Sequence, residues 1–228
     1  MSINQKIRIA IAATMLLLFT ISAPANAGTF IQQKGNTNPL TEGWEKYTSS
    51  GVYPTSSSIA NDLGTGIDAW SVNDSTSNVG ALGGYAQYIT TCQVNEAKTN
   101  GWRLKAKVRV VNPNSSFSNG VFYRDGQKTY QIQFSSTPNG DPTATLVTSA
   151  DGKGINYTLT GGANAYHLYE LVMPPNGTTA KLLIDGVERI SSYSGLNLIV
   201  NKPLIFFGAT SSYATGNVNY NLVQFVYP

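Results

Sequence analysis

The sequence contains few of the residues that build disulfides, zinc centres or histidine-dependent active sites. Its 228 residues include one cysteine, Cys92, and one histidine, His167. A single cysteine forms no disulfide within the chain, and one cysteine with one histidine gives no zinc ligand set. We therefore expect Cys92 to be a small buried hydrophobic residue rather than a reactive thiol. A chain of this length can bury a stable apolar core without cross-links.

Charged residues are also scarce, at 12% of the chain. Lys6 and Arg8 lie in the first 27 residues, which hold no carboxylate, so 13 basic residues face 12 acidic ones from Gly28 onward. Recognition of nucleic acid normally needs a clear excess of positive charge. The nearly neutral balance therefore argues against nucleic acid as a partner.

Only one long apolar run is present, Ile9–Ile21, and it directly follows the basic start. Ala25-Asn26-Ala27 comes next and has the small residues of a signal-peptide cleavage site. The run is short for a stable membrane span, and no second one follows it. We expect a signal peptide over 1–27, a single exported domain over 28–228, and no membrane span once the signal is removed.

Strand patterning is clearest after Trp102. Four apolar residues alternate with four basic ones, namely Leu104, Ala106, Val108 and Val110 with Arg103, Lys105, Lys107 and Arg109. A period of two predicts a strand with one buried and one solvated face. The four basic residues, here called the basic stripe, are either a platform for an acidic ligand or the wet side of a sheet. The second interpretation is favoured, because flexible hydrated lysines are poor at specific sugar recognition.

Turn signals recur along the rest of the chain at intervals typical of sandwiches. They are Asp125-Gly126, Pro138–Asp141, Asp151–Gly154, Pro174–Gly177 and Asp185-Gly186. Amphipathic helix is nearly absent, apart from a short turn expected near Asn95–Thr99. Residues 35–82 are rich in small polar residues and are expected to form ordered loops and short edge strands. The pattern predicts an all-β antiparallel sandwich of jelly-roll type.

Several short motifs occur in one order along the chain. They are Gly43-Trp44, Ala69-Trp70, Gly83–Tyr88, Gly101–Arg103, Tyr123–Gly126, Tyr166–Val172 and Asn219–Phe225. Together they resemble the lectin-like domain that flanks the catalytic propeller of Vibrio-type secreted bacterial sialidases. The resemblance runs over nearly all of 28–228 and implies a concanavalin A-like, laminin G-like jelly roll. It also implies non-catalytic carbohydrate recognition, with sialic acid as the ligand of the best-studied members.

Enzymatic activity finds little support in the sequence. Asp-box repeats of the sialidase propeller are absent, so sialidase activity is not implied. A glycosidase needs two positioned carboxylates, whereas the acidic residues here lie mostly in turns. Gln131-Ile132-Gln133 resembles the Gln-Ile-His strand of jelly-roll alginate lyases, but the histidine is replaced by glutamine. His167 is expected to be a hydrogen-bonded strand residue, and no catalytic residue is assigned.

The hairpin Asn119–Gln133 is the best candidate ligand site. Sugar binding needs an aromatic face and fixed polar groups. We expect Tyr123 to stack on a sugar and Arg124 or Lys128 to meet a sugar carboxylate, since a guanidinium fork accepts two oxygens at once. Gln131 and Gln133 share a strand face and are placed to address hydroxyls. The alternative is a solvated hairpin without a ligand.

These observations predict a secreted, non-catalytic lectin-like protein whose partner is a glycan, sialylated or otherwise acidic. No cofactor and no metal ligand is assigned, although structural calcium at the Asp-Gly loops stays open. The alternative function is a structural or adhesive extracellular protein that uses its sandwich surface for protein contacts. A jelly-roll glycanase or lyase ranks below both, and the oligomeric state stays open.

Overall fold

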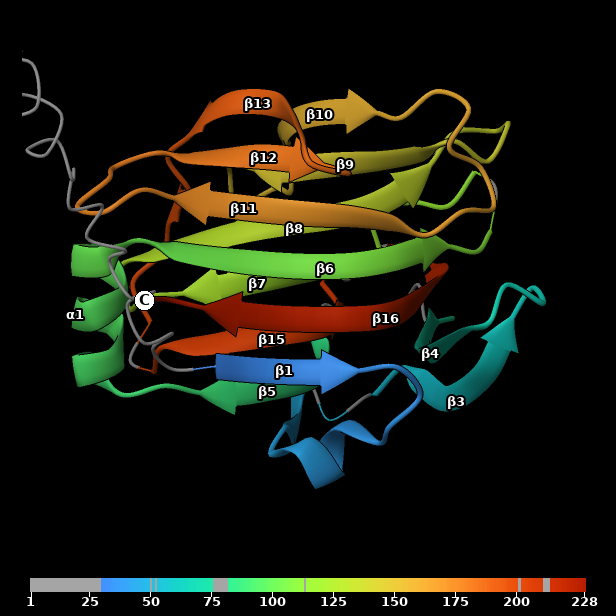
Figure 1. The fold of residues 1–228 in the computed structure, drawn as a ribbon, viewed down its shortest axis with the longest axis horizontal. Coiled ribbons are helices and arrows are strands. Elements are labelled where there is room, and N and C mark those ends of the chain that lie inside the picture. The colour runs from blue at the N-terminus through green and yellow to red at the C-terminus, as the bar shows by residue number, and fades with distance from the viewer. Residues whose placement is uncertain are drawn as a thin grey trace, which may run out of the picture.

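The computed structural model describes residues 30–49, 51, 53–75, 82–112, 114–200, 202–210 and 214–228. The expected signal peptide, 1–27, lies outside these residues. Two sheets of eight strands each pack against one another (Figure 1), and every pairing between described strands is antiparallel. The predicted all-β antiparallel sandwich is confirmed.

Sheet A lies in front in Figure 1. Its strands, in order across the sheet, are β13 (Val187–Tyr193), β12 (Ala180–Ile184), β11 (His167–Met173), β6 (Trp102–Val110), β16 (Gly216–Val226), β4 (Ile67–Asp74) and β3 (Thr55–Asp62), with β1 (Phe30–Lys34) paired to β16.

Sheet B lies behind it, in the order β10 (Gly154–Thr158), β9 (Pro142–Val147), β8 (Lys128–Ser136), β7 (Asn119–Arg124), β15 (Leu204–Ala209), β5 (Gly83–Tyr88) and β2 (Glu45–Thr48), with β14 (Leu196–Asn197) paired to β8.

The alternation after Trp102 forms β6, a central strand of sheet A between β11 and β16. Its apolar residues, from Leu104 to Val110, are at most 6% exposed and face the inner side of the sandwich. Trp102 is also buried, with its ring 5.1 Å from Tyr123 and 5.0 Å from Tyr130 across the core. The core therefore lies between the two sheets, as the period of two in this strand predicts.

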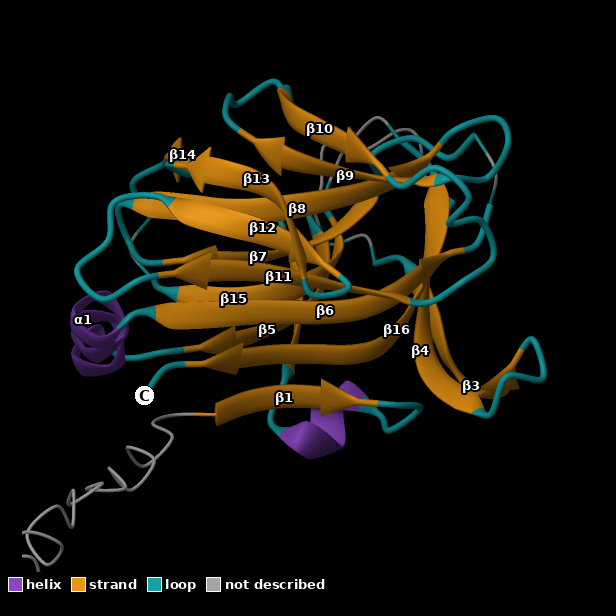
Figure 2. Cartoon of the chain, turned by 45° about the horizontal axis from the view of Figure 1, so that its top comes forward, coloured by secondary structure: helices purple, strands orange, loops and turns teal. Residues whose placement is uncertain are grey.

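One α-helix, α1 (Thr91–Asn100), covers an end of the sandwich, where the sequence predicts only a short turn (Figure 2). Thr90 accepts a hydrogen bond from the Gln93 backbone N–H, and the Gln93 side chain accepts one from Thr90 N–H, which completes a capping box. Val94 and Ala97 face inward. Cys92 lies on the exposed side of the helix, so the expectation that it is buried is wrong.

The segment 35–82 is more regular than predicted. In addition to the short edge strand β2 and the 3₁₀ helix η2 (Pro39–Glu42), it forms β3 and β4, each of eight residues. β4 pairs with both β3 and β16, so it is not an edge strand. Most side chains of β3 are exposed, and a strand with one weakly buried face gives little alternation from which to predict it.

Within the described residues, no helix is long and apolar enough to cross a membrane.

Phe207 tests the inner core. Its side chain is fully buried, with ring centroids 5.0 Å from Trp44, 5.2 Å from Tyr85 and 5.1 Å from Tyr220. We expect Phe207→Ala to lower the free energy of unfolding by about 3–5 kcal/mol, because it opens a cavity among these rings. Chemical denaturation followed by circular dichroism measures the loss. Ile199→Ala is the control: Ile199 is 87% exposed, so its change should stay within about 0.5 kcal/mol. Equal effects of the two variants would contradict the core assignment.

Candidate functional site

The outer face of sheet B carries a second, smaller apolar cluster. It consists of Ala86, Phe122, Leu204 and Phe206, with the partly buried Tyr47 and Leu82 packed against it. Phe122 and Phe206 are in register on neighbouring strands, and their rings stack with centroids 4.6 Å apart. The ring of Tyr47 meets Phe206 edge-on at 5.8 Å. We call this group the outer cluster. It gives one region of the outer face a rigid aromatic floor.

Arg124 lies on this floor. Its guanidinium carbon is 4.4 Å from the centroid of the Phe122 ring, which is the geometry of a cation–π contact. Both residues come from β7 and share the outer face because they are two positions apart. The contact holds the guanidinium over the ring. An arginine held in this way is preorganised for a ligand with two acceptor oxygens.

The electrostatics of Arg124 also favour an anionic ligand. Burial lowers the pKa of its guanidinium, and the Tyr47 side chain, which hydrogen-bonds it, raises the pKa in opposition. The group stays charged at neutral pH, because the ordinary pKa of arginine lies far above neutrality. Its Nε is buried and has no hydrogen-bond partner among the described residues. A partly desolvated cation with an unused donor is stabilised by an acceptor of negative charge.

An exposed aromatic ring lies near Arg124. Tyr88 of β5 and Arg124 of β7 both pair with Leu204 of the intervening β15, which places their backbones about 10 Å apart. Tyr88 is 40% exposed, and the Lys202 ammonium lies 5.5 Å from its ring centroid. Burial, then the neighbouring Tyr47 and Glu45, raises the pKa of Tyr88. We call Arg124, Tyr47, Tyr88, Glu45 and Lys202 the Arg124 site.

The predicted stacking residue, Tyr123, is in the wrong place for that role. It is fully buried in the inner core, with its ring centroid 4.6 Å from that of Phe225. In β7 the odd-numbered positions, Val121 and Tyr123, face inward, so Phe122 and Arg124 face outward. The prediction placed Tyr123 and Arg124 in one binding site, whereas consecutive strand residues point to opposite faces.

The other predicted residues are partly brought together. Gln131 and Gln133 do share the outer face of sheet B, since Gln131 pairs with Phe122 in register. They are only 7% and 4% exposed, so free ligand has little access to them in this structure. The Lys128 ammonium donates to the backbone carbonyl of Ser194 at 2.9 Å, so it is bound to the neighbouring loop. Of the five predicted residues, Arg124 has the environment of a ligand-binding group.

Sequence reasoning missed Tyr47, Tyr88 and the aromatic floor. The available signal was the absence of alternation in β15, where Leu204–Phe207 is apolar at four successive positions. Such a run indicates burial on both faces of a strand. It would have located an apolar outer face beside Arg124, although not the identity of the residues that line it.

The basic stripe of β6 is largely neutralised. Glu170 of β11 lies with its Oε1 3.8 Å from Arg103 Nη1 and 3.4 Å from Lys105 Nζ. Arg109 is 5% exposed, so the expectation that the whole stripe is solvated is wrong at this residue. Its partner is a carboxylate from a strand distant in sequence, which the local alternation could not reveal.

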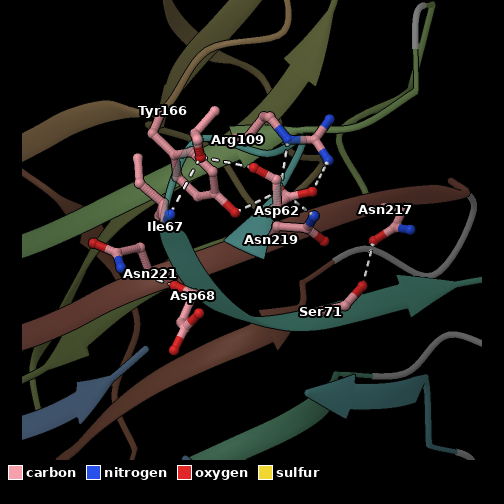
Figure 3. A network of polar contacts seen from close by, with 10 residues as sticks. Asp62, Ile67, Asp68, Ser71, Arg109, Tyr166, Asn217, Asn219 and Asn221 are labelled. Atoms are coloured by element: carbon pink, nitrogen blue, oxygen red, sulfur yellow. Dashed lines mark hydrogen bonds and ion pairs between the residues drawn. The ribbon is translucent and has the colours of Figure 1, made fainter. Parts of the chain in front are cut away.

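Arg109 belongs to a buried network around Asp62 (Figure 3). Its Nε and Nη2 donate to the two carboxylate oxygens of Asp62 at 2.8 and 2.9 Å. Tyr166 Oη donates to Asp62 Oδ2 at 2.6 Å, and Asn219 Nδ2 donates to the same atom at 2.8 Å. These four hydrogen bonds join β3, β6, β16 and the segment before β11. The carboxylate has little remaining capacity for a ligand, so we assign the network a structural role.

The side chain of His167 is accounted for by internal contacts. His167 lies with Nδ1 2.7 Å from Asp185 Oδ2 and Nε2 3.0 Å from the Gly162 carbonyl, which confirms it as a hydrogen-bonded strand residue. No group of three or more His, Cys, Asp or Glu residues that could hold a metal ion occurs in the described part of the chain.

Solved structures share this architecture at low sequence identity. The carbohydrate esterase of the Shiga toxin-encoding bacteriophage phi24B superposes with a TM-score of 0.63 at 11% identity, over 86% of this chain and 97% of that one. A Shewanella oneidensis protein of unknown function superposes with a TM-score of 0.55 at 9% sequence identity, over 100% of this chain and 94% of that one. Botulinum neurotoxin type C superposes with a TM-score of 0.51 at 12% sequence identity, over 87% of this chain and 47% of that one. The fold is thus a concanavalin A-like jelly-roll sandwich.

The model of the lectin insertion of Vibrio cholerae sialidase matches residues 69–227. The match covers more than half of the chain, so the chain belongs to this family of sialidase lectin-insertion domains. None of the curated proteins matches the chain. The predicted family is thereby confirmed.

The lowered pKa of Asp62 predicts that part of the free energy of unfolding is lost in acid. Burial raises its pKa, but the hydrogen bonds from Arg109, Tyr166 and Asn219 and the charge of Arg109 outweigh burial and lower the pKa from 3.8 to about 2. The folded pKa lies below the unfolded one, so the stabilisation is complete above pH 4 and is lost as the pH falls towards 2. The lost contribution is roughly 2 kcal/mol.

Urea denaturation of the wild type and Asp62→Asn at pH 7, 4 and 2 measures this contribution. At pH 7 the variant should be about 3–5 kcal/mol less stable, because Arg109 loses its buried partner. The difference in free energy of unfolding between the wild type and Asp62→Asn should narrow by roughly 2 kcal/mol at pH 2. Glu188→Gln, at an exposed ion pair with Lys181, should follow the wild type at every pH. A constant gap between wild type and Asp62→Asn would contradict the assigned ionisation.

Proposed function

We propose that the protein is an exported, non-catalytic lectin that binds an acidic glycan, with sialylated glycans preferred, through the Arg124 site. The observation that carries the proposal is the guanidinium of Arg124, which lies over the Phe122 ring and has a buried Nε without a partner among the described residues. Membership of the lectin-insertion family supports carbohydrate as the ligand class. Acidic sugar is inferred from the chemistry of the site.

The site offers the contacts that an acidic sugar requires. A carboxylate accepts two parallel hydrogen bonds from a guanidinium fork, which gives both charge and direction. The exposed face of Tyr88 provides a surface for the C–H groups of a sugar ring, and the Tyr47 hydroxyl lies beside the guanidinium. Lys202 adds a second positive charge near the ring. Glu45 at the edge disfavours ligands with several negative charges.

Non-catalytic binding is supported by the distribution of carboxylates. The Arg124 site holds one, Glu45, whereas glycoside hydrolysis uses a pair flanking the scissile bond. The esterase similarity is limited to the fold at 11% identity. Cell entry of botulinum neurotoxin type C is described as dependent on interaction with two ganglioside molecules. It is a precedent for glycolipid recognition by a protein that contains this fold.

Glycan-array binding and titration with 3′-sialyllactose test the proposal. Arg124→Gln should weaken binding at least about tenfold, because it removes a charged, bidentate contact. Arg124→Lys should recover only part of the loss, since an ammonium lacks the planar fork. Tyr88→Ala should weaken binding several-fold by removing the ring surface.

Arg103→Gln is the matched control. It makes the same charge change on a side chain that is 55% exposed and lies on the other sheet, and it should bind like the wild type. An array without hits would reject carbohydrate binding and favour an adhesive role through protein contacts. Equal loss in Arg103→Gln and Arg124→Gln would reject the site. Release of sugar or acyl groups during incubation would reject the non-catalytic assignment.

A further inference from the structure

A separate pocket lies at the α1 end of the sandwich. It has a volume of about 310 Å³ and is enclosed by one side of α1, the β7–β8 turn and residues near Pro203. This volume is at the lower end of the range of small-molecule sites and suits one sugar ring. It is lined by hydrogen-bonding residues, which include Thr91, Asn95 and Gln127, and by the apolar residues Val94, Val200 and Pro203.

The lining of the pocket includes an ion pair that is held in place by further hydrogen bonds. Lys98 Nζ lies 3.0 Å from Asp125 Oδ2, and the Asp125 side chain is only 5% exposed. The other carboxylate oxygen, Oδ1, accepts from the backbone N–H groups of Gln127 and Lys128 at 2.8 and 2.6 Å. Asp125 is therefore held from three directions, and it holds Lys98 in turn. The ammonium retains donors for a further acceptor.

The charge of the pocket selects the kind of ligand. Lys98 and Asp125 are the charged residues among those that line it, and each compensates the other. The side chains of Thr91 and Asn95 have no hydrogen-bond partner within the described part of the chain and project from successive turns of α1. A pocket without net charge, lined by both hydrogen-bonding and apolar groups, matches the hydroxyl and C–H groups of a neutral sugar.

We propose that this pocket binds a neutral sugar unit and is a second carbohydrate subsite, distinct from the Arg124 site. The inference rests on the proposed function for the chemical class of its ligand. The two sites adjoin each other: Arg124 and Asp125 are consecutive, as are Pro203 and Leu204, and Leu204 pairs with Arg124. A glycan with an acidic unit on the Arg124 site therefore has a neutral unit within reach of the pocket.

NMR titration of the isotope-labelled protein tests the subsite independently of acid binding. Methyl β-lactoside is the neutral probe, the methyl glycoside of N-acetylneuraminic acid is the acidic probe, and 3′-sialyllactose combines both. The lactoside should cause saturable shifts of the backbone amides of Gly126 and Gln127, because both residues line the pocket. The acidic glycoside should leave these amides unchanged. Sialyllactose should bind at least about tenfold more tightly than the acidic glycoside.

Asn95→Leu removes a polar group from the pocket wall and should abolish the lactoside shifts and the tenfold gain. Thr99→Leu is the matched control, because Thr99 is exposed on the same helix outside the pocket, and it should behave like the wild type. Shifts with free lactoside indicate a site for free sugar, and shifts with sialyllactose alone indicate a site for a unit within a longer glycan; both support the subsite.

The subsite is rejected if neither neutral-unit probe shifts these amides, or if Asn95→Leu and Thr99→Leu respond alike. Failure of the acidic glycoside alone to bind would reject the Arg124 site while the lactoside shifts still support the pocket. The two proposals therefore fail separately.

Discussion

Burial of β7 and β15 on both faces is the constraint on which the rest of the structure depends. Their inward side chains, among them Tyr123 and Phe207, contribute to the core between the sheets, where only well-packed apolar groups are tolerated. Their outward side chains, Phe122 and Phe206, then form an aromatic floor on the face that would otherwise be solvated. Arg124 is held by that floor, so the same two strands stabilise the sandwich and place its candidate ligand-binding group.

The two ends of the sandwich have different chemistry. At the end that carries β3, Asp62 and Arg109 form a buried polar network that ties four segments together. At the α1 end, by contrast, Arg124 keeps an unused donor and the pocket beside Asp125 keeps side chains without partners. Polar groups that are hydrogen-bonded within the protein have little capacity left for a ligand.

The fold was predictable because alternation and turn signals are local. The inner face of β6 follows directly from Leu104 to Val110, and the β-sandwich class follows from the recurring turns. The site was only partly predictable. A period of two shows that Tyr123 and Arg124 face opposite ways, but not which of them faces the core, since Phe122 and Tyr123 are both apolar aromatics. The burial of Arg109 and the exposure of Cys92 depend on segments distant in sequence or on the packing of a helix, which no local pattern encodes.

The position of β16 has a consequence for how the chain folds. This strand, Gly216–Val226, is the last of the described strands in chain order. It nevertheless lies inside sheet A, between β6 and β4, and also pairs with β1. The first described strand thus finds its partner only when the last has been synthesised. The pairings of β16 with β6, β4 and β1 each join residues more than a hundred positions apart in the sequence. Pairing between such distant segments lowers the folding rate relative to a sheet built from local hairpins, because the chain must close a long loop before the contact forms.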